Sequence, residues 1–374
     1  MFLKQAYIIM TKYQKVLNNM KSSSGAHYIG LDHIRAIAAF LVITWHFIHA
    51  GHGYPVVFEG APRIFPFAIL DEGHTGVALF MTLSGYLFAK LLNGKKIIYT
   101  RFMLNRALRL LPLLFIVILT VYVIHHINNG NSVEFIKSII MGVIIPSLPN
   151  GGWSITIEFH YYLLIPIFLW IIRKSPYNLI AIIIIAVTLR IIFYNIYGES
   201  QSLSYWTLLG RIDQFTLGML AFHLRDKTYK RHGLFAVLTV LFLLFYWYFD
   251  SQGGFYQSTV YPSPNKLWIF IPTIEAAFYA FLIAWYDNSF KHSEGRLSKI
   301  ISQFGKFSYS FYLLHFFIVF KAAAFIHENI MDISNFYLAC LWSLVFYVCM
   351  YPVGYISYKY IESPFLRKRK SYIL

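Results

Sequence analysis

Long apolar runs recur along the chain between short polar breaks, from residue 31 to residue 361. A membrane-spanning helix needs about 20 apolar residues to cross roughly 30 Å of hydrocarbon, and an open chain satisfies its backbone in lipid only as a helix. The pattern predicts an all-α fold, a polytopic membrane helix bundle of about ten transmembrane helices. They are expected at 31–50, 73–92, 108–127, 153–172, 177–194, 211–225, 233–249, 267–286, 306–326 and 336–358.

One further apolar run, FIKSIIMGVIIPSL at 135–148, is too short to span the bilayer. We expect it to lie at the membrane interface or to re-enter the bundle. The loops predicted on the outer side are 51–72, 128–152, 195–210 and 250–266, and they carry scattered Gly, Pro, Tyr and Trp. These residues suit a sugar-like or lipid-linked acceptor, although Trp and Tyr also anchor helices at the interface without any ligand.

Composition makes the bilayer the expected partner. Apolar residues form 58% of the 374 and charged residues 13%, whereas soluble proteins have about 45–50% and about 25%. The net charge of +16 comes from Lys and Arg clustered between apolar segments, which is the pattern of cytoplasmic loops. Nucleic acid is therefore not expected as a partner.

The basic residues also predict the orientation. Loops assigned to the outer side carry only Arg63, Lys137 and Lys266, and most other Lys and Arg fall on the opposite side. Because Lys and Arg are retained in the cytoplasm, both termini are expected there. Residues 1–27 would form an N-terminal cytoplasmic arm, 28–365 the membrane domain and 366–374 a basic cytoplasmic tail, in a multi-pass protein of a prokaryotic-type inner membrane.

The first candidate site lies in LDHIRAIAAFLVITWHF, residues 31–47. Eleven positions separate Arg35 from His46, which is about 1100° of rotation and roughly 16 Å of rise, so both share one helix face. Ionisable groups inside a span are costly and usually mark a site or pathway. A histidine can act as the general base that deprotonates a hydroxyl near neutral pH. The alternative is that His46 is a hydrogen-bonded structural residue. Asp32, at the start of the same helix, favours a functional site.

A second candidate is RFMLNRALRLLP, residues 101–112. Its Arg106 and Arg109 are three positions apart, on one side of a helix. Arginine binds phosphate bidentately, but arginines that only set the topology would occupy the same place. The sequence therefore leaves two roles open for this pair, namely binding of phosphate and setting of the membrane topology.

The third candidate is WSITIEFHYYLL, residues 153–164, which brings Glu158, His160 and Tyr161 into one span. A carboxylate inside a span needs a partner, and a glutamate that orients a histidine is frequent in acyl transfer. Ordinary pairing between helices is the alternative. Substrate-binding or structural polar groups are also expected in GRIDQFTLG at 210–218 and FGKFSYSFYLLHFF at 304–317, namely Arg211, Asp213, Tyr309, Tyr312 and His315. Arg190 and Lys321 lie in spans without an assigned role.

Metal and disulfide chemistry are not expected. The two cysteines, Cys340 and Cys349, are nine positions apart in the last apolar segment. About 900° of helical rotation separates them, so they face opposite sides.

Seven segments in a consistent order resemble the acyltransferase-3 family of integral membrane acyltransferases. They are LDxxRAIAAxxVxxxH at 31–46, GxxGVxLFxxLSGYL at 73–87, RxxR followed by LxP at 106–112, WSxxxExxxYY at 153–162, RxDxFxLG at 211–218, GKxSYxxYLxH at 305–315 and YIExPF at 360–365. The resemblance covers about 28–365 and implies that this range is an acyltransferase domain.

The resemblance implies transfer of an acyl group, usually acetyl, from cytosolic acyl-coenzyme A to a hydroxyl of an extracytoplasmic or lipid-linked glycan. The family's first-helix Arg and His fall on Arg35 and His46, and its paired arginines fall on Arg106 and Arg109. His33 stands where the family commonly has Gly, and His160 where it often has Gln. Further polar residues of the matching segments join the candidates, namely Ser84, Trp153 and Glu362.

The expected scheme places the phosphates of acyl-coenzyme A on Arg106 and Arg109. His46 then deprotonates the acceptor hydroxyl or is itself transiently acylated. Arg35 positions the donor or offsets developing negative charge, and Glu158 is the third catalytic candidate. No metal is predicted.

Two rival functions remain at this stage. One is a transporter or flippase for a lipid-linked sugar or small anion, and the other is an inactive relative that acts as a sensor or complex partner. For the enzyme, the acceptor stays open among lipopolysaccharide O-antigen, capsule or exopolysaccharide, peptidoglycan and small glycosides of the cell envelope.

Overall fold

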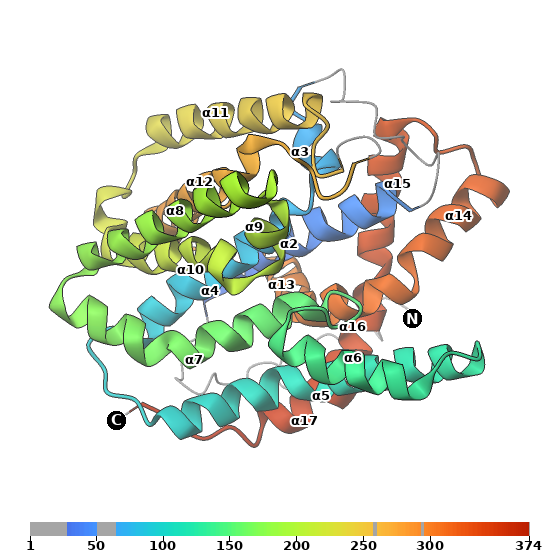
Figure 1. The fold of residues 1–374 in the computed structure, drawn as a ribbon, viewed down its shortest axis with the longest axis horizontal. Helices are drawn as coiled ribbons and strands as arrows, with labels where there is room; N and C mark the ends of the chain where they lie inside the picture. The colour runs from blue at the N-terminus through green and yellow to red at the C-terminus, as the bar shows by residue number, and fades with distance from the viewer. Residues whose placement is uncertain (1–27, 51–64, 257–259, 293–294, 374) are drawn as a thin grey trace.

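A computed structural model describes residues 28–50, 65–256, 260–292 and 295–373 (Figure 1). The predicted arm at 1–27 and most of the first outer loop, with Arg63, lie outside this range. Within the described ranges the chain is helical, and its β-structure is limited to a bridge between Ile97 and Ile373. The all-α fold class is confirmed.

The helices follow the labels of Figure 1. In chain order they are α2 (Ile29–Ile48), α3 (Ala68–Asp71), α4 (Thr75–Leu92), α5 (Tyr99–Ile127), α6 (Ser132–Ile144), α7 (Gly152–Lys174), η1 (Pro176–Asn178), α8 (Leu179–Tyr197), α9 (Gln201–Trp206), α10 (Leu208–His223), η2 (Arg225–Lys227), α11 (His232–Ser251), η3 (Lys266–Ile269), α12 (Ile271–Ser289), α13 (Arg296–Leu314), η4 (His315–Phe317), α14 (Val319–Asn329), α15 (Phe336–Cys349), α16 (Tyr351–Ser357), η5 (Tyr358–Glu362) and α17 (Ser363–Leu366).

Each of the ten predicted spans is helical, but not every one is long and apolar enough to cross a membrane. In the described part of the chain, 7 helices meet that condition, and the bent pair α13 and α14 would make 8. The segment at 211–225 forms α10, which has only 16 residues. The protein is a multi-pass membrane protein, whereas the count of ten and the cytoplasmic position of both termini stay predictions.

The prediction of one continuous helix over 306–326 is wrong. Helix α13 ends at Leu314, a short turn η4 follows, and α14 leaves at 59°. The start of α5 is also nine residues earlier than the predicted 108. Hydropathy places a helix where the chain is apolar, so it misses a charged first turn and cannot detect a bend inside an apolar run.

Helices α2 and α4 form the interior of the bundle. Of their most apolar windows, 78% is buried, compared with 17% for α8 and for α11. Helix α2 packs against α4, α13 and α15, and α4 packs against α10 and α12 (Figure 1). The apolar outer surfaces of α8 and α11 are therefore left for lipid, whereas polar groups on α2 and α4 face protein.

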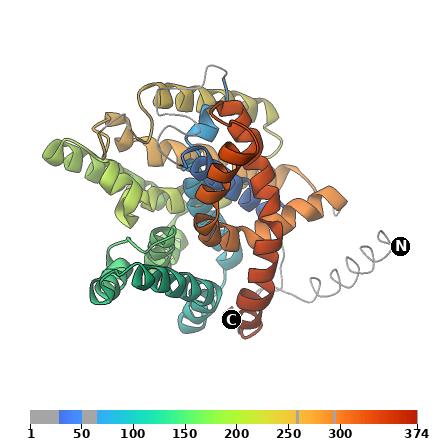
Figure 2. The same ribbon diagram turned by 90° about the vertical axis from the view of Figure 1, so that its right-hand side faces the viewer.

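The short apolar run at 135–148 forms α6, whose start is capped by the side chain of Asn131. Both views show α5 and α6 side by side at the edge of the molecule (Figures 1 and 2). Helix α6 contacts both α5 and α7, and its place at the interface or as a re-entrant segment stays a prediction.

Two glycines explain why α4 and α10 approach so closely. A Cβ atom at Gly85 would lie 2.0 Å from the carbonyl oxygen of Phe215, and one at Gly218 would lie 2.0 Å from that of Thr82. Small residues at a crossing let two membrane helices pack backbone to backbone. This crossing holds the polar side chains of α4 next to those of α10.

Candidate active site

A cavity opens between helices α2, α4, α5, α7, α10 and α13. Its volume, including the open space at its mouth, is about 840 Å³. Its four charged lining residues are Arg35, Arg106, Arg109 and Glu158. The rest of the lining is Val77, Phe80, Met81, Leu83, Ser84, Leu87, Phe88, Leu110, Ser154, Ile155, Tyr162, Phe215, Ser308, Tyr309 and Tyr312.

Arg106 and Arg109 of α5 both line this cavity, which agrees with the prediction that they share one side of the helix. Arg106 is 7% exposed and its guanidinium lies over the rings of Phe88 and Phe102 at 5.3 and 5.6 Å. Its Nε atom is buried and has no hydrogen-bond partner within the described residues. A buried donor without a partner is costly, so this guanidinium is suited to an anionic ligand.

Arg35 enters the cavity from the first turns of α2. Its guanidinium donates to Asp32 one turn earlier, and Asp32 also accepts from the hydroxyl of Ser302 on α13. Arg35 and Asp32 thus form an ion pair within α2, which the sequence analysis did not predict. The pair ties the start of α2 to α13 and holds the Arg35 side chain at the cavity wall.

Of the two alternatives left open for Glu158, the bond to His160 is wrong and pairing between helices is confirmed. Glu158 Oε1 accepts from the hydroxyl of Ser84 at 2.9 Å and from the hydroxyl of Tyr162. His160 instead bonds through Nε2 to the carbonyl of Val143 on α6. Two helical positions are about 200° apart, so the two side chains leave α7 on nearly opposite sides.

His46 forms a histidine pair with His315. Its Nδ1 lies 2.8 Å from the carbonyl oxygen of Val42 and 3.2 Å from Nε2 of His315. Nδ1 of His315 lies 3.0 Å from the carbonyl oxygen of Phe311. A carbonyl only accepts, so in the neutral rings we assign a proton to each Nδ1. Nε2 of His46 is then the unprotonated, basic nitrogen.

His46 is not part of the cavity lining, although it shares a helix face with Arg35. The connection runs through Tyr312, which lines the cavity and whose ring lies 6.3 Å from that of His315. The hydroxyl of Tyr312 accepts from Ser154 at 2.8 Å, and its ring packs against Phe80. These side chains separate the arginine-lined cavity from the histidine pair.

His46 also packs against aromatic rings. Trp45 lies edge-on to His46 with ring centroids 4.7 Å apart, and the ring of Tyr256 stacks on Trp45. The turn before Tyr256 is held by Glu72, whose carboxyl accepts from the backbone N–H of Phe255 at 3.0 Å. Burial, and next the charge of Asp71, raises the pKa of Glu72 well above its ordinary value.

The family model of the acyltransferase-3 family, described as an acyltransferase domain, matches residues 28–359. The chain belongs to the acyltransferase-3 family. Inferred O-acetyltransferases of Staphylococcus aureus strains COL and MRSA252 are each 25% identical to it, over 96% and 97% of this chain and 59% and 61% of their own length. The chain thus spans about three fifths of the curated relatives it matches. No solved structure matches it.

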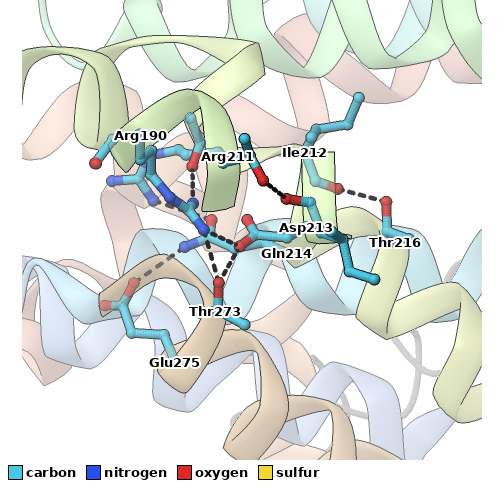
Figure 3. Close-up of polar contacts among 12 residues, drawn as sticks. Arg190, Arg211, Ile212, Asp213, Gln214, Thr216, Thr273 and Glu275 are labelled. Atoms are coloured by element: carbon cyan, nitrogen blue, oxygen red, sulfur yellow. Dashed lines mark hydrogen bonds and ion pairs between the residues drawn. The ribbon is translucent and has the colours of Figure 1, made fainter. Parts of the chain in front are cut away.

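The RxDxFxLG segment of this acyltransferase-3 protein serves packing between helices. Asp213 on α10 forms a fully buried ion pair with Arg190 on α8 at 2.7 Å, and the hydroxyl of Thr273 on α12 donates to the same carboxylate oxygen (Figure 3). Asp213 therefore does not face the cavity. Arg190, which the sequence left without a role, is its partner.

Arg211 is also not part of the cavity lining. Its Nε donates to the carbonyl of Tyr205 at 2.6 Å and its Nη1 to Gln214 at 3.1 Å. Gln214 continues the chain of bonds to Glu275 on α12 (Figure 3). Glu275 also accepts from the hydroxyl of Tyr246, so this network joins α9, α10, α11 and α12.

Of the remaining candidates, only Tyr309 reaches the cavity, and its hydroxyl donates to the carbonyl of Leu110 at 2.5 Å. Tyr161 is fully buried and stacks on Phe215 at 4.0 Å. Trp153 packs against the rings of Tyr205 and Trp206. Glu362 accepts from Ser310 and ties α13 to η5. These last three residues are placed to support the fold.

His33, which departs from the family pattern, also has structural partners in this acyltransferase-3 protein. Nδ1 lies 2.9 Å from the hydroxyl of Tyr286, and Nε2 lies 2.9 Å from the carbonyl of Ser298. Among the described residues, no group of three or more His, Cys, Asp and Glu side chains could hold a metal ion. Polar cavity residues that the sequence analysis did not single out are Ser154, Tyr162 and Ser308. Each is a fixed position of a segment that resembles the family, and this is the signal that could have found them.

Proposed function

We propose that this chain transfers an acyl group, in the first place acetyl, from cytosolic acyl-coenzyme A to a hydroxyl of an extracytoplasmic or lipid-linked carbohydrate, in a prokaryotic-type inner membrane. The observation that supports the proposal most is that one helix bundle holds two neighbouring features. An arginine-lined cavity lies on the side predicted to be cytoplasmic, and next to it His46 has a basic Nε2.

The arginines would bind the donor. Arg106 and Arg109 supply guanidinium groups to the phosphates, and the partnerless Nε of Arg106 supports this role. Roughly 16 Å of helix rise separates Arg35 from His46, which is too far for Arg35 to reach an oxyanion formed beside His46. Its position in the lining favours binding of the donor over stabilisation of the transition state.

His46 would carry the proton. Its Nε2 takes the proton of the acceptor hydroxyl while that oxygen attacks the thioester carbonyl carbon, and the protonated ring then returns the proton to the departing thiolate of coenzyme A. The bond to His315 orients the ring throughout. In the alternative route Nε2 itself attacks the thioester carbonyl carbon and the thiolate of coenzyme A departs. The acceptor hydroxyl then attacks the acyl-histidine, the bond from the acyl carbon to Nε2 breaks, and the hydroxyl proton passes to the thiolate.

Glu158 has a supporting place in this scheme. It is the one carboxylate among the charged lining residues and is held by Ser84 and Tyr162. Its charge offsets part of the positive charge of the three lining arginines and so keeps binding of the phosphates reversible.

A transporter of a lipid-linked sugar or small anion remains the second candidate, because one observation favours it. The α13–α14 helix breaks beside His315 with a bend of 59°, and broken helices form substrate sites in many transporters. The enzyme is preferred because the cavity and the histidine pair supply groups for chemistry as well as for passage.

The test is reconstitution of the full chain in liposomes that contain glycan acceptors inside, with acetyl-labelled acetyl-coenzyme A outside. Covalent label on the glycan supports the proposal; His46→Ala should lower the rate by about 10²–10⁴-fold, the range of general acid–base catalysis. His160→Gln, a histidine of α7 bonded to α6, is the matched control. Movement of unmodified glycan without label transfer would decide for the transporter.

A further inference from the structure

A second cavity lies at the ends of α4, α7 and α10 that are predicted to be cytoplasmic. It encloses about 800 Å³ to its open mouth and is lined by Ala89, Leu92, Asn93, Gly94, Lys95, Lys96, Leu169, Ile172, Arg173 and His223. It shares no lining residue with the arginine-lined cavity. Along α4 and α7, the buried rings of Phe88, Tyr162 and Phe168 lie between the two cavities.

The charged Lys and Arg side chains that line this second cavity are all positive. Lys95, Lys96 and Arg173 come from two different segments, and among the residues that the structure describes no Asp or Glu is part of the lining. Within the described residues the side chains of these three form no ion pair. Retention of basic residues in cytoplasmic loops explains their side of the membrane, but it does not explain why two segments place them around one cavity with no counter-charge.

The other half of the lining is apolar. Ala89 and Leu92 are buried, and Leu169 and Ile172 on α7 are partly exposed. The neighbouring surface of α7 continues this apolar character, since Ile167 is 54% exposed. A ligand that fits both halves carries a phosphate-like anion and an apolar chain.

The neighbouring pair Trp170 and Lys174 indicates the level in the membrane at which the second cavity lies. Trp170 is 58% exposed, and the ammonium of Lys174 lies 3.9 Å from the centre of its ring. Exposed Trp next to Lys at the end of a span is the arrangement of residues at the level of lipid headgroups. Because Trp170 follows Leu169 and Lys174 follows Arg173 in the sequence, we infer that the second cavity opens at headgroup depth.

We propose that this cavity binds the headgroup of an anionic phospholipid, with its phosphate on Lys95, Lys96 and Arg173 and the start of an acyl chain along Leu169 and Ile172. Basic pockets between membrane helices on the cytoplasmic side are suited to such headgroups. The bound lipid connects the ends of α4, α7 and α10. The site is independent of the proposed acyl transfer, because its lining is separate from the donor cavity.

The test uses the purified full chain in zwitterionic nanodiscs, with phosphatidylglycerol or cardiolipin added against phosphatidylcholine, and bound lipid counted by native mass spectrometry. Tight binding of one anionic lipid is expected, and the variant Lys95→Ala, Lys96→Ala, Arg173→Ala should bind it about 100-fold more weakly. The control variant Arg231→Ala, Lys291→Ala, Arg296→Ala removes the same charge from other loops on the same predicted side and should retain the binding.

Three outcomes would overturn the proposal. Equal binding of phosphatidylcholine would mean that no anion is recognised, and equal weakening in both triple variants would mean that only the overall charge attracts the lipid. The phosphate could also come from a soluble source, so coenzyme A is titrated in parallel. If the Lys95, Lys96 and Arg173 variant loses coenzyme A binding and keeps lipid binding, the cavity belongs to the coenzyme and not to a lipid.

Discussion

Nδ1 of His46 lies 3.2 Å from Nε2 of His315, and this contact joins the interior helix α2 to the break between α13 and α14. His315 is the first residue of η4, at the point where the helix bends. The bend thus places a hydrogen-bond acceptor against His46 and fixes which nitrogen of His46 stays basic.

The histidine pair predicts an intermediate effect for His315→Ala. His46 would keep its bond to Val42 but lose one partner, so transfer should fall by about tenfold, which corresponds to one neutral hydrogen bond. The fall should appear in kcat, with KM for acyl-coenzyme A unchanged. Steady-state kinetics of label transfer measure both.

The control for this substitution is His327→Ala, which removes a partly exposed histidine of α14 that pairs with Asp332. It should leave kcat unchanged. A loss in His315→Ala as large as that in His46→Ala would contradict an orienting role and would place His315 in the chemical step itself.

Arg106 predicts a defect in donor binding. Arg106→Gln removes a charged donor whose Nε has no partner in the described residues, so KM for acyl-coenzyme A should rise by about 10–100-fold. Arg106→Lys should recover only part of this, because lysine lacks the guanidinium fork. The measurement is kcat and KM at saturating glycan.

Arg101→Gln is the matched control, since Arg101 lies on the same helix α5 and is exposed. It should leave KM unchanged. If both substitutions raise KM equally, or if both only lower the amount of inserted protein, the arginines of α5 serve topology and not the donor.

The Arg190–Asp213 pair predicts a loss of stability. Both side chains are 0% exposed, and Asp213→Ala leaves the Arg190 charge buried without its partner. Such a change costs about 3–5 kcal/mol. The double variant Arg190→Met, Asp213→Leu removes both charges and should recover most of the loss. Thermal unfolding in detergent compares the three proteins.

An equal loss in the single and double variants would contradict this account, because the packing of α8 on α10 would then matter more than the charge. Transfer activity per folded protein should be unchanged in the double variant. The reason is that neither residue lines the cavity.

Glu72 predicts a pH effect on stability. Burial raises its pKa in the folded protein above the ordinary value of 4.5. A raised carboxyl pKa contributes stability that is fully present below the unfolded pKa and is lost as pH rises through the folded pKa. Glu72→Gln keeps an acceptor for the backbone N–H of Phe255 but cannot ionise. The free energy of unfolding of this variant, relative to that of the unsubstituted protein, should therefore increase from pH 4.5 upwards.

The measurement is the melting temperature of both proteins in one detergent across this pH range. Asp332→Asn is the control, because Asp332 lies in an exposed turn where it accepts from Ser334, which lowers its pKa. It should not reproduce the trend. Parallel curves for Glu72→Gln and the unsubstituted protein would show that Glu72 does not titrate differently on folding.

Much of the secondary structure was predictable because lipid leaves an apolar run only one way to satisfy its backbone. The shared face of Arg35 and His46 followed from about 100° of rotation per residue, and the spacing of Arg106 and Arg109 brought both into one cavity in the same way. These relations lie within single helices, so they need no knowledge of what packs against them.

Relations between helices were not predictable. Glu158 was expected to pair with His160 and instead bonds to Ser84 on α4, and Arg211 and Asp213 proved to belong to a network between helices. The partner of a buried polar group depends on which helices cross, and hydropathy records only the cost of placing each side chain in lipid.

The sequence by itself therefore determined an all-helical membrane protein, its family and the helix faces that carry Arg35, His46, Arg106 and Arg109. The tertiary structure alone decided that Arg35 lines the cavity while His46 lies behind Tyr312 and against His315. The physical reason is that local rotation and backbone hydrogen bonding act within one helix, whereas cavities and partners arise only where several helices meet.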